Sequence, residues 1–491
     1  MTTRRLITLL LSSLAALLFA AASSSAAPAP KVVGNRLVDA TTGAAFVPHG
    51  VNWPSFEYAC HYGYGYSNEA GPATVGPTDE QARLIAGWHA NVVRVPLNQD
   101  CWLGDDGHPA GGLNAQGYRD AVADWVGRLH AAGLAVILDL HWSGPDGIPA
   151  DGQRMMADER SPAFWSSVAA RFRDDPSVLF DAFNEPFSHG FADGTTLSLG
   201  WSCWRDGGCP GARESDGAGT ADRRTFLIVG MQPLVSAIRA TGARQPILLG
   251  GLDYANDLRG WLAARPDDDQ LVASFHNYDG QRCETEACWN AEIAPVAAQV
   301  PVVTGEFGET DCKEDHDRRY MDWADAHGVG YLAWQWVVLA PDEQANPACA
   351  GLALISDVQG TPNAPNGTAL KSHLDALAAG GGAAGTTGGA GGGTSGSGDR
   401  RAPRPTKVQL RRTRRGLAVR VRLDEAATVR ATLTRRGTSR PTTVSRKVGR
   451  GTHVVTLLKR RPARGRYHVS LRATDAAGNR SRAAGASLRV R

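Results

Sequence analysis

The sequence lacks the patterns by which cofactors and metals are usually bound. Its 491 residues contain no Gly-rich phosphate loop, no dinucleotide fingerprint and no cluster with metal-ligand spacing. The closest cysteines, Cys203 with Cys209 and Cys283 with Cys288, do not have the CxxC spacing of a zinc site. We therefore expect no cofactor and no metal, and a chemistry performed by side chains alone.

Long hydrophobic runs are scarce as well, and the one of note stands at the N-terminus. Arg4 and Arg5 precede an apolar run from Leu6 to Ala22, and small residues follow around Ala26 to Ala29. This three-part pattern is typical of a secretory signal peptide. A membrane anchor is the alternative, but the run is short and no second span follows. We expect residues 1–29 to be removed and the mature protein to be extracellular, with no membrane span.

Free thiols are the next expected absence, because an oxidising compartment converts cysteines to disulfides. The chain has eight cysteines, and four pairs are neighbours in the sequence: Cys60 with Cys101, Cys203 with Cys209, Cys283 with Cys288, and Cys312 with Cys349. Eight cysteines allow roughly a hundred pairings, so the connectivity stays open at this point.

Acidic residues are nearly missing from the end of the chain. From Arg400 onward, 27 Lys and Arg stand against 3 Asp and Glu, whereas the whole chain has a net charge of +3. Residues 378–399 before this segment are almost wholly Gly, Ala, Ser and Thr, which is typical of a flexible linker. Alternating apolar and polar residues, as in Leu417–Leu423, predict a small all-β sandwich over residues 400–491. We expect this domain to bind an anionic cell-wall polymer and no nucleic acid; a solvated spacer is the alternative.

Residues 30–377 alternate short apolar strands with helical stretches, such as Tyr118–Ala132, whose apolar side chains share one face. Eight strands are predicted: Phe46–Asn52, Asn91–Leu97, Leu134–His141, Val178–Asn184, Pro246–Gly250, Leu271–His276, Pro301–Glu306 and Gly330–Trp336. Continuous apolar strands between helices indicate a parallel sheet covered on both faces. Eight such repeats in this length predict an α/β fold of the (β/α)8 barrel type.

Functional side chains of such a barrel lie at the carboxyl ends of its strands. Six predicted strand ends carry polar and aromatic residues: Arg94–Asn98, Asp139–Trp142, Phe183–Pro186, Phe275–Tyr278, Thr304–Gly308 and Trp334–Trp336. They include Glu185 and Glu306. Glycoside hydrolysis needs two such carboxyls. One protonates the departing oxygen, and the other acts at the anomeric carbon, which becomes cation-like in the transition state. Their distance separates retaining from inverting chemistry, which the sequence leaves open.

Residues 33–373 resemble glycoside hydrolase family 5, the barrel family of cellulases and mannanases. The resemblance rests on Asn184-Glu185-Pro186 after the fourth strand and Glu306 at the seventh, with supporting positions at Arg94, His141, His276, Tyr278 and Trp334. It implies a retaining enzyme with Glu185 as acid/base and Glu306 as nucleophile. The last strands of the basic domain resemble immunoglobulin-like or fibronectin type III modules.

The chemistry of each supporting group indicates a role in substrate binding or in positioning. We expect Arg94 to donate to Glu306, Asn184 to bind the sugar 2-hydroxyl, and His276 and Tyr278 to position the two glutamates. We expect His141, supported by Asp139, to bind the sugar. Trp334, Trp53 and Trp142 are predicted to stack on sugar rings, and Trp336 competes with Trp334 because strand alternation places both on one face. Glu309 and Asp311 are interpreted as a solvated loop.

The favoured function is endo-acting hydrolysis of a β-1,4-glucan by a secreted monomer. Mannan, xylan-type and β-1,3-glucan chains and glycolipid glycans stay open, because loops set the substrate within this family. A different class of function is a non-catalytic glycan-binding or wall-adhesion protein. The presence of both Glu185 and Glu306 argues against that alternative.

Overall fold

The structure is a computed structural model. It describes residues 26–62, 66–67, 75–104, 114–215, 223–339, 352–381, 403–413, 416–423, 427–435, 442–448, 451–458, 461–474, 481 and 484–490. These fall into two compact units, one within residues 1–386 and one within 387–491. Most of the predicted signal peptide, up to residue 25, and the predicted linker from residue 382 lie outside the described residues.

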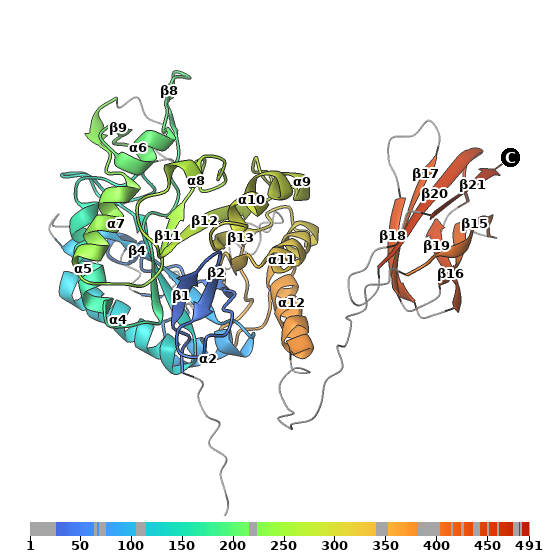
Figure 1. The fold of residues 1–491 in the computed structure, drawn as a ribbon, viewed down its shortest axis with the longest axis horizontal. Coiled ribbons are helices and arrows are strands. Elements are labelled where there is room, and N and C mark those ends of the chain that lie inside the picture. The colour runs from blue at the N-terminus through green and yellow to red at the C-terminus, as the bar shows by residue number, and fades with distance from the viewer. Residues whose placement is uncertain are drawn as a thin grey trace, which may run out of the picture. The chain divides into compact units, whose positions relative to one another are not determined.

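The first unit is built around a closed barrel of eight parallel strands (Figure 1). In order around the barrel they are β3 (His49–Asn52), β4 (Val92–Asn98), β5 (Ala135–Trp142), β6 (Val178–Asp181), β11 (Ile247–Gly250), β12 (Leu271–Tyr278), β13 (Val302–Gly308) and β14 (Gly330–Ala333). Each overlaps a strand predicted from the sequence. The (β/α)8 barrel is therefore confirmed.

Helices surround the barrel and follow its strands (Figure 1). They are α1 (Ala59–Tyr62), α2 (Asp79–Gly87), α3 (Gln99–Leu103), α4 (Ala115–Ala131), α5 (Ser161–Phe172), α6 (Trp201–Asp206), α7 (Met231–Ala240), α8 (Trp261–Ala264), α9 (Glu286–Cys288), the π-helix η2 (Trp289–Ile293), α10 (Ala294–Ala297), α11 (Asp315–His327) and α12 (Asn366–Gly381). Helix α4 buries the predicted apolar face, including Val122 and Trp125. None of the helices in the described part of the chain has the length and hydrophobicity of a membrane span.

Strand alternation explains why the barrel interior is apolar at one end and polar at the other. In β5, Ala135 and Ile137 belong to the cluster inside the barrel, whereas Val136 and Leu138 pack outward. Side chains two residues apart share a face, so Asp139 and His141 continue the inward row. The same alternation places Arg94 of β4 above Val92. The polar carboxyl end of the barrel is thus the expected place of the site.

The amino end of the barrel is closed by a hairpin of β1 (Pro30–Val33) and β2 (Arg36–Asp39). Leu37 of β2 packs with Phe46 and with the inward apolar residues of the barrel strands. Four further short strands lie in the long segment between β6 and β11: β7 (His189–Gly190), β8 (Thr196–Leu197), β9 (Pro210–Ala212) and β10 (Thr225–Leu227).

The expectation of disulfides is confirmed, and three of the four neighbouring pairs form them: Cys60–Cys101, Cys203–Cys209 and Cys283–Cys288. Cys312 is also disulfide-bonded. Cys349, the predicted partner of Cys312, lies outside the described residues.

The second unit consists of two antiparallel sheets with a shared apolar core. One sheet has the order β15 (Thr406–Arg412), β16 (Leu417–Leu423), β19 (Gly451–Leu458), and the other β18 (Thr442–Val448), β17 (Ala427–Arg435), β20 (Gly465–Thr474), β21 (Ala484–Val490). Val419 and Val421 from the first sheet share one core cluster with Val429 and Val469 from the second. The all-β sandwich predicted for the basic domain is therefore confirmed.

Candidate active site

Glu185 and Glu306 meet at the carboxyl end of the barrel. Glu185 follows β6 by four residues and Glu306 lies in β13, and both are at least nine-tenths buried. One carboxylate oxygen of each lies within 4.8 Å of the other. Retaining glycosidases hold their carboxyls roughly 5–5.5 Å apart, whereas inverting enzymes leave roughly 6.5–9.5 Å for a water molecule. The short separation matches the retaining arrangement.

Both oxygens of Glu306 accept hydrogen bonds. Arg94 donates from Nη1 to Oε1 over 2.9 Å, and the Tyr278 hydroxyl donates to Oε2 over 2.7 Å. These are the contacts that the sequence predicted for Arg94 and Tyr278. Two donors from β4 and β12 fix the plane of this carboxylate, so that its position is set by the barrel framework rather than by a loop.

Arg94 is fully buried and forms ion pairs with more than one carboxylate. It lies 3.0 Å from Asp139, 3.0 Å from Asp181 and 2.9 Å from Glu306. Burial raises the pKa of Asp139 to about 7, although Arg94 opposes the shift. Burial also raises the pKa of Asp181 well above its ordinary value. One guanidinium cannot balance three buried carboxylates, so the aspartates around it tend to keep a proton.

Glu185 has its own two partners. His276 places Nδ1 2.7 Å from Oε1, and Gln153 donates from Nε2 to Oε2 over 2.9 Å. Burial lowers the pKa of His276 to about 3, and the nearby Arg94 charge contributes. His276 is therefore neutral near neutral pH, and it orients Glu185 without adding charge. The predicted positioning role of His276 agrees with this geometry.

The groups predicted to contact sugar line the same end of the barrel. His141 and Trp334 are stacked with ring centroids 5.5 Å apart and planes 8° apart. Asp139 lies 2.7 Å from Nδ1 of His141, as expected for a supporting residue. Asn184 accepts a bond from Arg94 through Oδ1, whereas its buried Nδ2 has no partner within the described residues. Trp142 at the end of β5 is half-buried.

Two tryptophan predictions are resolved by burial. Trp53 is fully buried, with its ring centroid 4.6 Å from that of Trp125, so the prediction that Trp53 stacks on a sugar is wrong. Trp336 is also buried and donates to Gln81 from Nε1 over 2.9 Å. Strand β14 ends at Ala333, so alternation no longer places Trp336 beside Trp334. Trp334 is the residue that faces the site.

Glu309 is not part of a solvated loop. Its side chain accepts bonds from the backbone N–H groups of His316 and Asp317 at the beginning of α11, and the residue is 2% exposed. Unpaired N–H groups at a helix N-terminus favour such a carboxylate. The interpretation of Glu309 as solvated is therefore wrong, because its carboxylate caps the beginning of α11.

Three polar residues of the site, the buried Asn52 and Glu57 and the half-buried Gln153, were missed by the sequence analysis. Asn52 at the end of β3 accepts from Arg94 Nη1 over 3.1 Å and donates to the backbone oxygen of Gly305 over 2.9 Å. Gln153 and Glu57 come from loops. Burial raises the pKa of Glu57 to about 8, and the charges of Asp139 and Glu306 add to this shift. Only Asn52 had a sequence signal, its place at a strand end.

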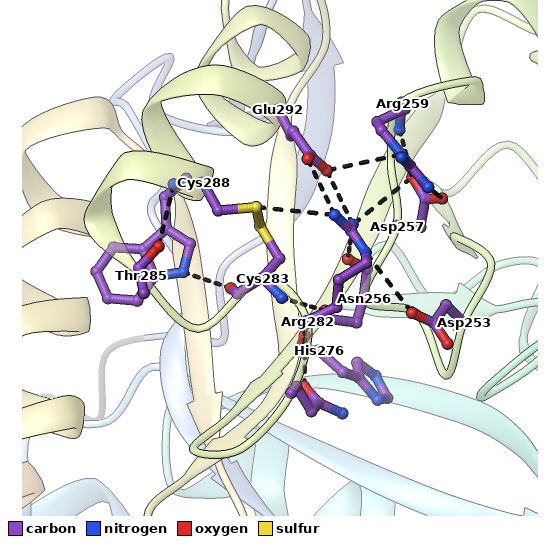
Figure 2. Close-up of a disulfide and its surroundings, with 12 residues drawn as sticks. Asp253, Asn256, Asp257, Arg259, His276, Arg282, Cys283, Thr285, Cys288 and Glu292 are labelled. Atoms are coloured by element: carbon purple, nitrogen blue, oxygen red, sulfur yellow. Dashed lines mark hydrogen bonds and ion pairs between the residues drawn. A yellow bond between two sulfur atoms is a disulfide. The ribbon is translucent and has the colours of Figure 1, made fainter.

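The loop after β12 forms one wall next to His276. Figure 2 shows the Cys283–Cys288 disulfide with Arg282, which donates to Glu292 over 2.9 and 2.8 Å. Arg282 also donates to the backbone oxygen of Asn256, in the loop after β11, over 2.9 Å. The disulfide and the ion pair close the segment after β12, and the hydrogen bond from Arg282 to Asn256 joins it to the loop after β11.

Comparison with known proteins agrees with this geometry. Residues 47–338 match the family model described as cellulase, glycosyl hydrolase family 5. A mannan endo-1,4-β-mannosidase of Streptomyces lividans is 26% identical over 318 residues, 62% of this chain and 65% of that protein. This chain thus spans slightly less than two thirds of that relative. A xyloglucan-specific endo-β-1,4-glucanase of Bacteroides ovatus is 39% identical over 70 residues, 12% of this chain and 14% of that protein.

Solved structures show the same fold. A β-glucanase of Saccharophagus degradans has a TM-score of 0.52 and 18% identity, with 71% of this chain and 94% of that chain covered. The same enzyme in complex with cellotetraose gives a TM-score of 0.51. The family model covers more than half of the chain, and it includes both glutamates and their donors. The chain belongs to glycosyl hydrolase family 5.

Proposed function

We propose that this protein is a retaining endo-β-1,4-glucanase that acts by double displacement. The observation that carries the proposal is the Glu185–Glu306 pair, whose oxygens approach within 4.8 Å while each carboxyl has its own hydrogen-bond partners. Two carboxyls at this separation can flank a sugar ring, so that one attacks the anomeric carbon from one face while the other protonates the leaving oxygen on the opposite face.

In the first step, Glu306 attacks the anomeric carbon, and Glu185 gives its proton to the departing glycosidic oxygen. A covalent glycosyl-enzyme forms as the bond to the leaving sugar breaks. Arg94 and Tyr278 hold Glu306 in line for the attack. The free Nδ2 group of Asn184 is available for the sugar 2-hydroxyl, a contact that strengthens in the transition state.

In the second step, Glu185 is a carboxylate and takes a proton from water, which then attacks the anomeric carbon. The bond to Glu306 breaks and the β-configuration is restored. His276 and Gln153 hold Glu185 during both steps. Because His276 stays neutral, its imidazole does not take the proton that Glu185 donates and accepts in the two steps.

A β-1,4-glucan is the favoured substrate. Trp334 and His141 have parallel rings, and Trp142 is half-buried at the end of β5, which suits stacking of flat pyranose rings. The match to a model described as cellulase, and the glucanases among the similar proteins, support the same choice. A β-1,4-mannan is the second candidate, because the relative aligned over 318 residues is a mannan endo-1,4-β-mannosidase.

The test is the release of reducing ends from carboxymethylcellulose, β-mannan and xyloglucan, with product sizes measured by chromatography. We expect carboxymethylcellulose to be cut fastest, with short oligosaccharides of many sizes appearing early, as for an endo-acting enzyme. Turnover of mannan alone would replace the first candidate by the second. Release of no reducing ends from any polymer would contradict the assignment as a polysaccharide hydrolase.

We also propose that the protein is exported. The basic, apolar and small-residue order of residues 1–29 supports this proposal, as do the disulfides, which persist in oxidising compartments. N-terminal sequencing of the protein from the culture medium is expected to find cleavage near Ala29. Retention of Met1 in a cell-bound protein would contradict export with cleavage.

A further inference from the structure

One outward face of the C-terminal sandwich brings arginines together, with no acid among its described residues. In the β17–β20 pair, Arg430 stands directly opposite Arg472, and in the β20–β21 pair, Arg466 stands opposite Arg489. All four side chains are exposed. None of them forms an ion pair within the described residues, and the three acids of the domain, Asp424, Glu425 and Asp475, lie outside those residues.

This arrangement works against the stability of the sheet. Like charges directly opposite each other on neighbouring strands are destabilising. On the inner face, the same strands alternate with Val429, Val469 and Leu471, which supply the core. The core therefore explains the inward residues, whereas no packing requirement explains two opposed arginine pairs.

Between the two pairs the face is rich in hydroxyl groups. Thr432 is paired with Ser470, and Thr434 with His468. Arg466 and Arg472 are six residues apart on β20, which corresponds to about 20 Å along the strand. Two guanidinium pairs at the ends of a hydroxyl-lined strip match an extended ligand with repeated negative charges.

We propose that this face of the β18–β17–β20–β21 sheet, called the arginine face, binds a linear phosphodiester-linked polyol outside the cell. Guanidinium groups bind phosphate through two parallel N–H bonds, which a pair of arginines offers to each phosphate. Apart from the imidazole of His468, the described residues of the face include no exposed aromatic ring, and none is Phe, Tyr or Trp. Single-stranded nucleic acid is held by stacking on such rings, so a polymer without bases is the better match.

A matched control lies on the opposite outward face. Arg420 and Arg422 of β16 are exposed as well, but their partners across the sheet are Gln409, Val454, Thr406 and Thr452. The double change R430S/R472S therefore removes the same charge as R420S/R422S. Only the first change removes an opposed pair. Both variants keep the two sheets and their core.

The experiment measures binding of the full chain to poly(glycerol phosphate), polygalacturonate and duplex DNA at two salt concentrations. We expect R430S/R472S to weaken binding to poly(glycerol phosphate) about tenfold or more and R420S/R422S about twofold or less. We also expect R430S/R472S to raise the melting temperature of the domain, which the control leaves unchanged. Equal losses in the two variants would overturn the assignment to this face. Tighter binding of DNA or polygalacturonate than of poly(glycerol phosphate) would overturn the assignment of the ligand as a phosphodiester-linked polyol.

A second, independent observation concerns the loop between β11 and α8. Asp253, Tyr254 and Ala255 are three consecutive residues in the left-handed region, with φ of 56°, 57° and 58°. L-amino acids with a side chain pay conformational energy there, so surrounding contacts must hold the turn. Tyr254 donates from its backbone N to the oxygen of Pro186, next to Glu185, and its ring stacks on Phe187 at 4.7 Å.

The same turn also holds His276. The backbone N–H of His276 donates to the oxygen of Ala255 over 3.0 Å. Asn256, which is 1% exposed, donates from Nδ2 to the oxygen of His276 over 2.8 Å, and its Oδ1 accepts from the backbone N–H of Cys283 over 2.8 Å. Figure 2 shows Asn256 between His276 and the disulfide-closed loop. Its amide thus bridges the backbone on both sides of the β12 loop.

We infer that Asn256 is a positioning residue, which sets the imidazole of His276 against Glu185 and thereby the transfer of the proton to the leaving oxygen. The inference rests on the proposed role of Glu185 as acid. His276 Nδ1 lies 2.7 Å from Glu185 and 3.7 Å from Glu306, so a displaced imidazole affects Glu185 more. Glu306 keeps the hydrogen bonds from Arg94 and Tyr278, so glycosylation that needs no acid is expected to continue.

The test compares Asn256→Ala with Asn91→Ala. Asn91 is a matched control, because it too bridges two backbone groups, His49 N and Val47 O, at the amino end of the barrel. For Asn256→Ala we expect kcat/KM to fall about tenfold or more with a glucan substrate and less than about twofold with a dinitrophenyl glycoside of the same sugar. Asn91→Ala should lower stability and change both substrates alike.

Equal losses with both substrates in Asn256→Ala would overturn the inference. A separate result tests the proposed function. If Glu185→Gln loses as much activity with the dinitrophenyl glycoside as with glucan, then Glu185 is not the acid. If Glu185→Gln has the dependence and Asn256→Ala does not, the role of Asn256 alone is wrong.

Discussion

Arginine has opposite surroundings in the two units of the chain. In the barrel, the fully buried Arg94 meets Asp139, Asp181 and Glu306 within 3.0 Å. In the sandwich, the exposed Arg430 stands opposite another arginine. A buried charge needs partners because desolvation is costly, whereas an exposed charge is hydrated and screened by salt. The fold of the barrel therefore requires its arginine, and the fold of the sandwich does not.

The charge of the whole chain hides this contrast. Residues 400–491 have a net charge of +24 and residues 1–399 one of −21, although the sum is only +3. Charges that the fold does not need are available for a partner. The comparison predicts that substitutions in the barrel affect chemistry and stability, whereas substitutions in the sandwich affect binding and leave catalysis unchanged.

The largest effect is expected for Glu306→Ala. The covalent step has no substitute, so kcat should fall by about 10⁴-fold or more with every substrate. Azide can occupy the space left by the side chain and attack the substrate directly. One inversion then gives the α-glycosyl azide, which NMR identifies. Formation of the β-azide by this variant would assign the nucleophile role to another residue.

Glu185→Gln should depend on the leaving group. Loss of general acid help costs roughly 10²–10⁴-fold for a glycan, but little for a dinitrophenyl glycoside, whose leaving group needs no proton. The glycosyl-enzyme should then accumulate, because its hydrolysis needs the same residue as base. Azide should release it as the β-glycosyl azide after two inversions. An α-azide here, together with a β-azide from Glu306→Ala, would reverse the two roles.

Arg94→Lys changes the buried, ion-paired arginine of the barrel, and Arg430→Lys changes an exposed arginine of the sandwich. A lysine is a point charge that cannot reach three carboxylates and Asn184 together, so unpaired buried carboxylates remain. We expect a loss of about 3–5 kcal/mol in the free energy of unfolding and roughly 10²–10³-fold in kcat. Arg430→Lys should change neither. Denaturant unfolding and initial rates check both variants, and equal effects would remove the distinction.

The sequence predicted the framework of the site because strand order and alternation determine it. Arg94, His141 and His276 lie on barrel strands and continue inward rows that begin with apolar residues. Glu306 lies in β13 beside a register shift between Thr304 and Phe307, so alternation alone does not place it. The identity of the two glutamates came from the resemblance to the family. The same strand reasoning was wrong for Trp336, since β14 ends three residues before it.

Loop residues could not be predicted in the same way. Gln153, Glu57 and Asn256 reach the site through turns that have no period in the sequence. Trp53 was misplaced because a loop tryptophan packs on Trp125 of α4 as readily as on a sugar. Glu309 became buried through the position at which α11 begins. In each case a tertiary contact, absent from local sequence, decided the outcome.

Glu57→Gln tests the pH dependence of the barrel. Burial places the pKa of Glu57 at about 8 in the folded protein, above its ordinary value of 4.5. The protonated group therefore contributes stability that is fully present below about pH 4.5 and is lost as the pH rises through 8. In urea unfolding of the full chain, Glu57→Gln should lose less stability than the parent between pH 5 and 8. Glu80→Gln, at an exposed position of α2, should behave as the parent. An unchanged slope in Glu57→Gln would contradict the shifted pKa.

The smallest effect on catalysis is expected from removal of residues 400–491. Arg94, Glu185 and Glu306 all lie in the first unit, so kcat/KM on a soluble glycan should change by less than about twofold. Retention on a column of anionic polymer should be lost at low salt, because the remaining chain has a net charge of −21. The full chain should elute earlier as salt increases. A truncated protein that loses activity on soluble glycan would show that the sandwich supports the barrel. A truncated protein that stays on the column would place the anion-binding groups in the barrel. The arginines of the two units would then differ only in their burial.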